Sequence, residues 1–353
     1  MKNTKSSHFA AIDIGYSNLK FNHGTLKPNG HVDVKSSVVV PATAIKEEHY
    51  AYVSIPGLYN ETAPFRVFVD GMSWFVGHRT IRLDYSPRHT HQDYIETATY
   101  RAMFYALLTD LETDTLDILV TGLPANQITD PKRVEFLERA FTGKHRISDS
   151  REVEVKKIVI VAQPSGAYFN FCANQKKQPL IENRKLLILD SGYYSLNFML
   201  VENGKPELNY SGTIPKSGFL DILEEAVRNI TQDLNITVEP ASLEDAIQRG
   251  KSTIFIKGKN TEFQKYIAMA SARIANDALV SIKTKLRHID KISLTLLVGG
   301  ACHLYEKQAE VLLNNCKEFK VSSRPLLANL DGYWLHAISL AQGSQKKTEA
   351  EYQ

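Results

Sequence analysis

Two short segments of this chain place an aspartate and a glycine directly after a run of apolar residues. Asp13 and Gly15 follow such a run near the start of the chain, and Asp190 and Gly192 follow another in its second half. Runs of this length predict buried strands, each of which brings its carboxylate to the strand's end. Because glycine lacks a Cβ, a phosphate group can approach the backbone amides of such a turn. The chemistry that these residues predict is phosphate binding.

Each turn is followed by a second extended run that carries polar residues. Residues 17–21 form this run after the first turn, and residues 195–201 form it after the second, up to an Asn-Gly hairpin dipeptide at 203–204. Asp190 lies half the chain length after Asp13. One Asp-x-Gly is common in ordinary turns, but two copies in matched settings favour a phosphate site. They also predict two related domains.

The composition is that of an ordinary globular chain. A length of 353 residues suggests two domains with ample core, and 43% hydrophobic and 23% charged residues are usual values. A net charge of +3 is too small to indicate a nucleic-acid or membrane-surface partner. Cys172, Cys302 and Cys316 have no metal-ligand spacing and fit a reducing cytoplasm. We find no signal-peptide pattern and no membrane span, so we expect a cytoplasmic protein.

The pattern of apolar residues predicts the elements that would position the two turns. Further strands are predicted over 34–40, 66–69, 72–76, 116–121, 153–162, 254–256, 294–298 and 319–322. Helices are predicted over 94–111, 131–142, 163–171, 220–234, 261–287 and 331–340, with 240–260 otherwise irregular and a frayed tail from 343. Strands that alternate with crossover helices favour sheets with parallel members, and the hairpin that opens each half makes those sheets mixed.

Five motifs in this order resemble those of the superfamily of actin, sugar kinases and heat-shock-chaperone ATPases. They are Asp13-Ile14-Gly15 with Lys20 (phosphate-one), 161–167 (first connecting), 189–197 (phosphate-two), 297–301 (adenosine) and 329–332 (second connecting). The set spans nearly the whole chain. Within the superfamily, Thr121-Gly122-Leu123-Pro124 and residues 211–218 are similar to segments of the bacterial plasmid-segregation actins of the ParM/StbA family.

The resemblance implies an α/β actin-like fold. Such a fold has two related ribonuclease-H-like domains, each with a mixed five-stranded sheet flanked by helices, and a nucleotide cleft between them. Domain I would comprise 1–163 and 335–353, with a β-rich insert at about 24–90, and domain II would comprise 164–334, with an insert at about 219–260.

The resemblance also assigns roles to single residues. Asp13 and Asp190 would hold Mg²⁺, through water, across the phosphates of ATP or GTP, and Lys20 would place its ammonium group on those phosphates. Gln163 would orient the attacking water, which Asn197 could share, so Gln163, Asp190 and Asn197 are the candidate catalytic residues. The candidate cofactor-binding residues are Asp13, Gly15, Tyr16, Ser17, Asn18, Lys20, Ser191, Gly192, Tyr193, Gly218, Gly299, Gly300 and Ala301.

Plainer roles are open for the same residues. The two aspartates could be strand-end caps, Gln163 could be a structural amide, and Gly218 could be a helix cap that does not contact nucleotide. Asn276 or Arg273 could contact the base, and their spacing does not choose between them.

The chain departs from the superfamily pattern at two places in the phosphate-two motif. Asn197 stands where many members carry an acidic residue or histidine, and Tyr193-Tyr194 stand where smaller residues are common. An uncharged Gln163 supplies no strong base, so slow hydrolysis is expected.

The function implied is that of a filament-forming ATPase. Its partners would be further copies of itself and a small DNA-binding adaptor bound to a plasmid centromere, in the bacterial cytoplasm, without direct contact to nucleic acid or membrane. A small-molecule kinase or phosphatase of the same fold is one alternative. A nucleotide-switched binding module that does not polymerise is another.

Overall fold

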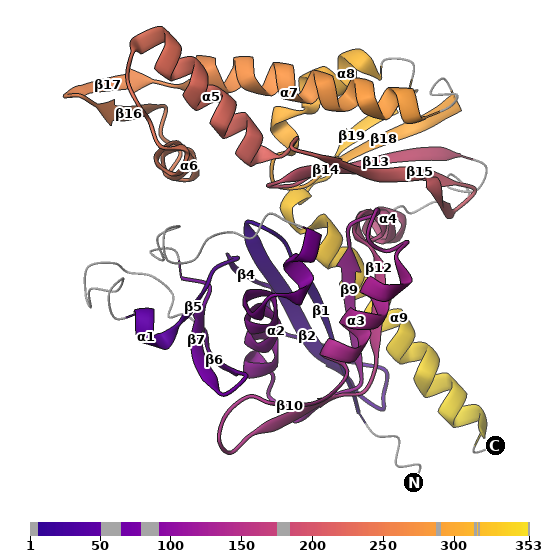
Figure 1. The fold of residues 1–353 in the computed structure, drawn as a ribbon. Coiled ribbons are helices and arrows are strands. Elements are labelled where there is room, and N and C mark those ends of the chain that lie inside the picture. The colour runs from indigo at the N-terminus through magenta and orange to yellow at the C-terminus, as the bar shows by residue number, and fades with distance from the viewer. Residues whose placement is uncertain are drawn as a thin grey trace. The chain divides into compact units, whose positions relative to one another are not determined.

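The computed structural model of the chain describes residues 6–50, 65–78, 92–174, 184–286, 291–313, 316 and 318–351. It divides into two compact units, unit 1 (Met1–Lys176 with Leu327–Gln353) and unit 2 (Lys177–Leu326). Both units are α/β structures with a mixed sheet flanked by helices (Figure 1), which confirms the predicted fold class. The domain limits at 163/164 and 334/335 stay a prediction. Residues 51–64 and 79–90 of the predicted insert lie outside the described residues.

Unit 1 is organised around a six-stranded sheet of order β12-β9-β1-β2-β3, in which β4 also pairs with β2. Its strands are β1 (Ser7–Ile14), β2 (Asn18–Leu26), β3 (Val32–Val34), β4 (Val38–Pro41), β9 (Ile118–Leu123) and β12 (Ile158–Ala162). β1 is antiparallel to β2 and parallel to β9, which is in turn parallel to β12. The carboxyl ends of β1, β9 and β12 therefore share one edge of the sheet.

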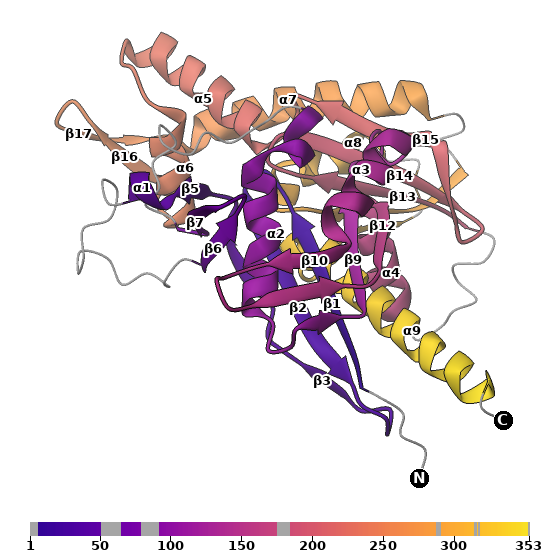
Figure 2. The same ribbon diagram turned by 60° about the horizontal axis from the view of Figure 1, so that its bottom comes forward.

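Helices cover both faces of this sheet (Figure 2). They are α2 (Ala98–Asp110) and α3 (Pro131–Phe141) on one face, and α9 (Ala328–Glu351), with α4 (Gln163–Asn174) packed along it, on the other. Successive residues of β1 point to opposite faces. Ile12 accordingly joins the cluster beneath α2, whereas Ala11 joins the cluster that contains Tyr333 of α9. Burial on both faces explains the apolar run before Asp13.

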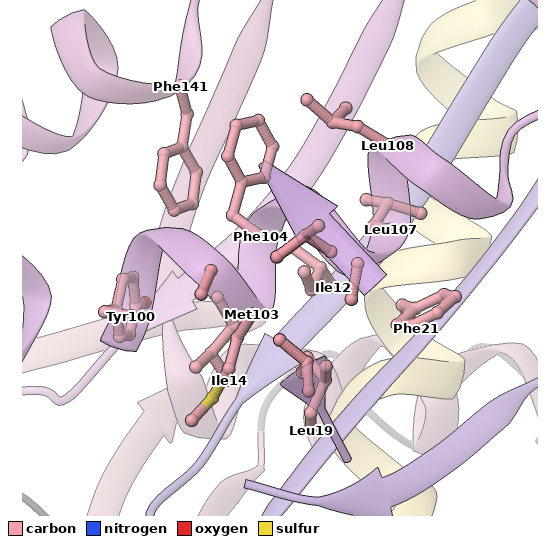
Figure 3. Packing of buried hydrophobic residues seen from close by; sticks show 14 of the residues in the cluster. Ile12, Ile14, Leu19, Phe21, Tyr100, Met103, Phe104, Leu107, Leu108 and Phe141 are labelled. Carbon is pink, nitrogen blue, oxygen red and sulfur yellow. The ribbon is translucent and has the colours of Figure 1, made fainter. Parts of the chain in front are cut away.

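The core between the sheet and α2 is rich in aromatic side chains (Figure 3). Phe104 of α2 stacks on Phe141 of α3 with ring centroids 3.8 Å apart. Ile12 and Leu19, which come from the two strands on either side of the first turn, are fully buried in the same cluster. Complete burial of such side chains stabilises a fold by about 1.5–3 kcal/mol each. The first turn is thus held on a rigid hairpin.

The rest of unit 1 forms two small sheets. One contains β5 (Ala44–Lys46), β6 (Phe65–Val69) and β7 (Met72–Val76), and the other contains β8 (Thr115–Leu116), β10 (Gly143–Arg146) and β11 (Glu152–Val155). Two short helices, α1 (Glu47–Tyr50) and the 3-10 helix η1 (Gln92–Glu96), complete it. The hairpin predicted at Asp70-Gly71 is confirmed, since both residues have the positive φ (52° and 78°) that a tight two-residue turn requires.

Unit 2 repeats the sheet pattern of unit 1 with five strands in the order β15-β14-β13-β18-β19. They are β13 (Lys185–Ser191), β14 (Ser195–Glu202), β15 (Lys205–Pro215), β18 (Ile292–Val298) and β19 (Glu318–Val321). β13 is antiparallel to β14 and parallel to β18, as β1 is to β2 and β9. The predicted hairpin at 203–204 joins β14 and β15.

The helices α5 (Phe219–Leu234) and α7 (Gln264–Lys285) pack against each other and share one apolar cluster with residues of the unit 2 sheet (Figure 1). The smaller elements of unit 2 are α6 (Pro240–Gln248), the hairpin of β16 (Thr253–Ile256) and β17 (Lys259–Glu262), the 3-10 helix η4 (Cys302–Leu304) and α8 (Glu306–Leu312). The 3-10 helix η5 (Pro325–Leu327) lies where the chain passes from unit 2 back to unit 1. α6 lies against α5 and β16.

Three predicted strands are each divided in two, and the one over 116–121 becomes β8 and β9, which belong to different sheets. The strand over 34–40 becomes β3 and β4, separated by polar residues 35–37, and both pair with the edge of β2 opposite β1, which makes the first sheet six-stranded rather than five-stranded. The strand over 153–162 becomes β11 and β12, which belong to different sheets. The chain leaves one sheet and enters the other at Lys156-Lys157, whose side chains are exposed.

Two predicted helices and one segment predicted to be irregular also differ from the structure. α2 begins only at Ala98, because the Thr97 hydroxyl accepts from the Tyr100 amide and caps it there. The prediction of irregular structure over 240–260 was wrong, since α6 starts at Pro240 in the first helical turn, where proline is favoured. The last helix, α9, extends from Ala328 to Glu351 and so continues through the tail that we expected to be frayed.

We predict that Gly332→Ala destabilises unit 1 through the crossing of α4 and α9. A Cβ built on Gly332 would lie 1.7 Å from the carbonyl oxygen of Gly166, so the helices would have to separate. We expect the free energy of unfolding, measured by urea denaturation, to fall by about 1–3 kcal/mol.

Gly343→Ala is the matched control, because it lies on the same helix and an added Cβ there meets nothing within 4 Å. It should stabilise the protein by up to about 1 kcal/mol, the difference in helix propensity. Equal effects of the two substitutions would contradict the proposed role of the crossing.

Candidate phosphate-binding turns

The two Asp-x-Gly turns have the same backbone geometry. The amide of Gly15 donates to the carbonyl of Asn18 (3.1 Å), and the amide of Gly192 donates to the carbonyl of Ser195 (3.0 Å). A Cβ added to Gly15 or Gly192 would lie 3.2 or 3.3 Å from that same carbonyl oxygen. The repeat that the sequence predicts is therefore present in three dimensions within each unit.

The strand positions of the two aspartates also correspond. In the antiparallel register, Asp13 lies opposite Lys20, and Asp190 lies opposite Asn197. Each aspartate is therefore paired with the residue seven positions later, across the same turn. The chemistry of the partner differs, because one site has a cation and the other a neutral amide.

In unit 1, the carboxylate of Asp13 is buried and bonded to a cation. Asp13 is only 4% exposed, and its Oδ2 accepts from Lys20 Nζ at 2.6 Å. A buried carboxylate is stable only when it is paired or hydrogen-bonded in this way. Because an ammonium has three donors and a carboxylate several acceptor positions, both groups can bind a further partner.

Two aromatic residues to which the sequence analysis assigned no role, Tyr94 and Tyr100, pack at the first turn. Tyr94 stacks on Tyr16 with ring centroids 4.9 Å apart and donates from its hydroxyl to the Gly15 carbonyl at 3.5 Å. Burial, followed by the negative charge of Asp13, raises the pKa of the Tyr100 hydroxyl. Tyr100, which packs edge-on against Tyr94 with ring centroids 5.1 Å apart, is thus a neutral packing group. Ser17 and Asn18 lie in it, half-buried.

Gln163 lies at the same edge of the sheet as Asp13. It follows β12 directly and is the first residue of α4, beside Gly122 near the end of β9. Ligands of open α/β sheets bind at the carboxyl ends of parallel strands, which is where these residues lie. The Tyr333 hydroxyl donates to the backbone carbonyl of Gln163 at 3.1 Å. This bond does not involve the side-chain amide of Gln163.

Unit 2 brings the adenosine motif to the end of the strand that carries Asp190. Gly299 has a φ of +94°, and a Cβ there would lie 2.6 Å from Asp190 Oδ1, so only glycine fits. The amide of Ala301 donates to the Ser191 carbonyl at 3.2 Å. Gly300 lies between these two contacts, with the side chain of Leu326 nearby.

Buried polar side chains lie near the carboxyl end of β13 and near that of β9, the strand beside β1 in unit 1. The hydroxyls of Ser191 and Thr121 are fully buried and have no hydrogen-bond partner in the structure. Asn197 is 5% exposed, and its Oδ1 accepts from the Thr213 hydroxyl at 2.7 Å. Thr213 therefore orients the Asn197 amide. Sequence reasoning assigned no role to Thr213, although its β-strand position opposite Asn197 could have indicated one.

Packing within unit 2 is enough to explain why residue 218 is a glycine. It is the N-cap of α5, and a Cβ there would lie 2.2 Å from the Tyr193 carbonyl oxygen. The first amides of α5 donate to the turn, from Phe219 to Gly192 (3.1 Å) and from Leu220 to Tyr193 (2.8 Å). These bonds support the role of a helix cap, and contact of Gly218 with a nucleotide stays a prediction.

The two candidates for base contact lie on the surface of α7. Arg273 donates from Nε to Glu225 (2.8 Å) and lies 3.6 Å from Asp277, so its charge is already balanced. Asn276 is exposed. The base-contacting residue stays open.

Each turn by itself offers an oxygen donor of the kind that Mg²⁺ takes when it is bound through water. Magnesium prefers oxygen ligands, keeps several waters and takes one or two carboxylates. Asp13 and Asp190 each provide one buried carboxylate. In the part of the chain that the structure describes, no cluster of three or more His, Cys, Asp or Glu side chains could hold a metal ion by itself.

A cavity of about 360 Å³ in unit 1 lies elsewhere, and none of the predicted site residues lines it. Arg66 and Arg151 line it, but Arg66 is bonded to Glu47 (2.9 and 2.8 Å) and Arg151 to Asp114 (2.8 Å). Both guanidinium groups are therefore already paired with carboxylates.

Among the described residues, no helix is long and apolar enough to span a membrane.

Two protein-family models match consecutive parts of the chain. Residues 11–166 match the N-terminal domain of actin-like proteins, and residues 188–310 match the C-terminal domain of the archaeal actin homologue related to MreB. The first match contains the turn at Asp13, and the second contains the turn at Asp190. No curated protein sequence matches the chain.

Solved structures with the same fold include filament proteins and a nucleotide complex. The apo ParM protein of pSK41 is 14% identical with a TM-score of 0.66, and the match covers 96% of this chain and 99% of that one. A 15-stranded ParM filament from Clostridium botulinum is 16% identical with a TM-score of 0.70 (96% and 99% covered). The archaeal actin homologue Ta0583 in complex with ADP is 15% identical with a TM-score of 0.67 (93% and 98% covered).

Proposed function

Because the chain belongs to the actin-like superfamily, we propose that it is a filament-forming nucleoside triphosphatase that binds ATP or GTP with Mg²⁺. The observation that supports this most is the repeated turn, in which Gly15 and Gly192 make the same hydrogen bond two residues after a buried aspartate. A fold can host many activities, so the proposal depends on these residues rather than on the fold alone.

The chain's own residues would divide the work of phosphoryl transfer, which needs positioning and charge neutralisation. Asp13 and Asp190 would hold Mg²⁺ through water, and the bound ion would neutralise charge on the phosphates. Lys20 would add a second positive charge from the first turn. Gln163 and Asn197 would orient the attacking water, and since neither is a strong base, hydrolysis would be slow.

The remaining predicted residues would hold the nucleotide. The turn residues Tyr16, Ser17 and Asn18, and Ser191, Gly192 and Tyr193 in the second turn, would lie against the phosphates. Gly299, Gly300 and Ala301 would give the backbone room beside the base and ribose. The resemblance implies that one nucleotide uses both turns, and that its hydrolysis destabilises the polymer.

The cellular role in this proposal is the movement of plasmid DNA. Similar structures include a ParM filament and an Alp12 filament, and they support self-association of this chain. A small DNA-binding adaptor at a plasmid centromere would link the polymer to its cargo in the bacterial cytoplasm. The adaptor, the cargo and the location rest on the family resemblance.

Sedimentation of the purified protein tests the proposal. We expect it to pellet with Mg-ATP or Mg-GTP, and to remain in the supernatant without nucleotide or with excess EDTA. Filaments in negative-stain micrographs of the pellet would support assembly over aggregation. A monomer whose nucleotide turnover is stimulated by a sugar would favour the kinase alternative instead. Tight nucleotide binding with neither assembly nor turnover would favour a switched binding module.

A further inference from the structure

The phosphate-two turn is tied by a side chain to a helix for which the sequence predicted no structure. Tyr193, directly after Gly192, is 9% exposed, and its hydroxyl donates to Glu244 Oε2 of α6 at 2.9 Å. In the family resemblance described above, Tyr193 and Tyr194 stand where smaller residues are common. A long side chain is needed here because it must reach α6.

Glu244 is a buried carboxylate that accepts hydrogen bonds from two neutral side chains, Tyr193 and Gln248. It is 6% exposed, and its other oxygen, Oε1, accepts from Gln248 Nε2 at 3.0 Å. Removing a carboxylate from water is unfavourable unless hydrogen bonds replace the lost hydration. The bond to Tyr193 therefore lowers the free-energy cost of burying Glu244. Loss of this bond would affect both Tyr193 in the turn and Glu244 in α6.

The backbone of Tyr193 is fixed at the same time by the start of α5. Its carbonyl accepts from the Leu220 amide at 2.8 Å, and Gly218 lies so close that a Cβ there would come within 2.2 Å of that carbonyl. Tyr193 is thus held by α5 through its main chain and by α6 through its side chain. A displacement of the turn must strain one of these two attachments.

We infer that Glu244 is a positioning residue for the phosphate-two turn, and that it links nucleotide binding at this turn to α6. The inference rests on the proposed function, because it requires a nucleotide at Gly192. Through Tyr193, Glu244 holds the turn in the shape that presents its amides to phosphate. Linkage is reciprocal, so a nucleotide that fixes the turn must also stabilise α6 and the β16–β17 hairpin that packs on it.

Nucleotide affinity and hydrogen exchange of Tyr193→Phe test this inference. The substitution keeps the ring and removes only the hydroxyl. In the wild-type protein, saturating Mg-ADP or Mg-GDP should slow amide exchange over 240–248 at least threefold. We expect Tyr193→Phe to bind the same nucleotide about tenfold more weakly, as the loss of one bond to a charged group predicts. It should also lose the slowed exchange over 240–248.

Two further variants separate positioning from mere stability. Glu244→Gln keeps an oxygen acceptor for Tyr193 and should retain most of the affinity and of the exchange response, whereas Glu244→Leu should lose both. Tyr266→Phe is the matched control, because the Tyr266 hydroxyl also donates to a carboxylate of unit 2, Asp233 at 2.5 Å, but does not touch the turn. It should behave as the wild type in both measurements. If Tyr193→Phe fails to fold, the pair of Glu244 variants decides.

The outcomes distinguish this inference from the proposed function. Wild-type protein that binds nucleotide while exchange over 240–248 stays unchanged overturns the inference and leaves the proposed function intact. So does a Tyr193→Phe or Glu244→Leu variant with wild-type affinity and response. If neither Mg-ADP nor Mg-GDP binds the wild-type protein, the proposed function fails, and the link to α6 fails with it.

Discussion

Asp190→Asn should weaken Mg-nucleotide binding by about 100-fold, the upper range for loss of a group that orients a metal, and should abolish nucleotide-dependent pelleting. Asparagine has nearly the same shape, so the close contact with Gly299 and the pairing of β13 with β14 should persist. What changes is the charge that would hold hydrated Mg²⁺. Isothermal titration with Mg-ATP and Mg-GTP measures the effect.

The dependence on Mg²⁺ identifies the cause. In excess EDTA, wild-type protein and Asp190→Asn should bind nucleotide with similar, weak affinity, because the lost charge acts through the ion. Asp245→Asn is the control, since it removes one negative charge from the exposed surface of α6, where Asp245 pairs with Arg249 at 2.8 Å. Wild-type affinity of Asp190→Asn would show that this carboxylate is a strand-end cap.

Asp13→Asn is expected to have a similar effect on affinity and a larger effect on stability. Its side chain pairs with Lys20, which is 12% exposed, and loss of the charge would leave that ammonium poorly compensated. For this reason the variant at Asp190 is the cleaner test of metal binding.

Gln163→Ala should lower the steady-state rate of nucleotide hydrolysis by about 100-fold, the lower range for a group that positions or activates water. Nucleotide affinity should change little, because Gln163 is proposed to contact the water and not the phosphates. Filaments should then persist for longer after nucleotide is exhausted from solution. Phosphate release and light scattering, followed in the same sample, measure both effects.

The structure allows the two roles considered for Gln163 to be separated. Tyr333 bonds its backbone carbonyl, so replacement of the side chain leaves that bond in place. A structural amide would reveal itself by a lower thermal midpoint with unchanged hydrolysis. Asn170→Ala on the same helix, where the Asn170 side chain bonds Asn174 at 2.7 Å, controls for loss of an amide from α4. It should leave hydrolysis unchanged.

The sequence by itself determined those features that depend on neighbouring residues. Apolar runs before Asp13 and Asp190 predicted two buried strands, and the glycine two residues later predicted the turns, because strand burial and turn conformation are set locally. Asp70-Gly71 and Asp130-Pro131 likewise predicted a hairpin and a helix start that the structure confirms. The matched halves of the fold followed from the repeat of such local signals.

Only the tertiary structure decided how distant segments meet. The approach of Gly332 to Gly166, and the bond from Tyr193 to Glu244, join residues whose separation in sequence carries no signal. The sequence did not predict α6 because one of its buried positions is a glutamate, a residue type that is usually exposed. Packing and hydrogen bonds between remote side chains decide such features, and they exist only after the chain has folded.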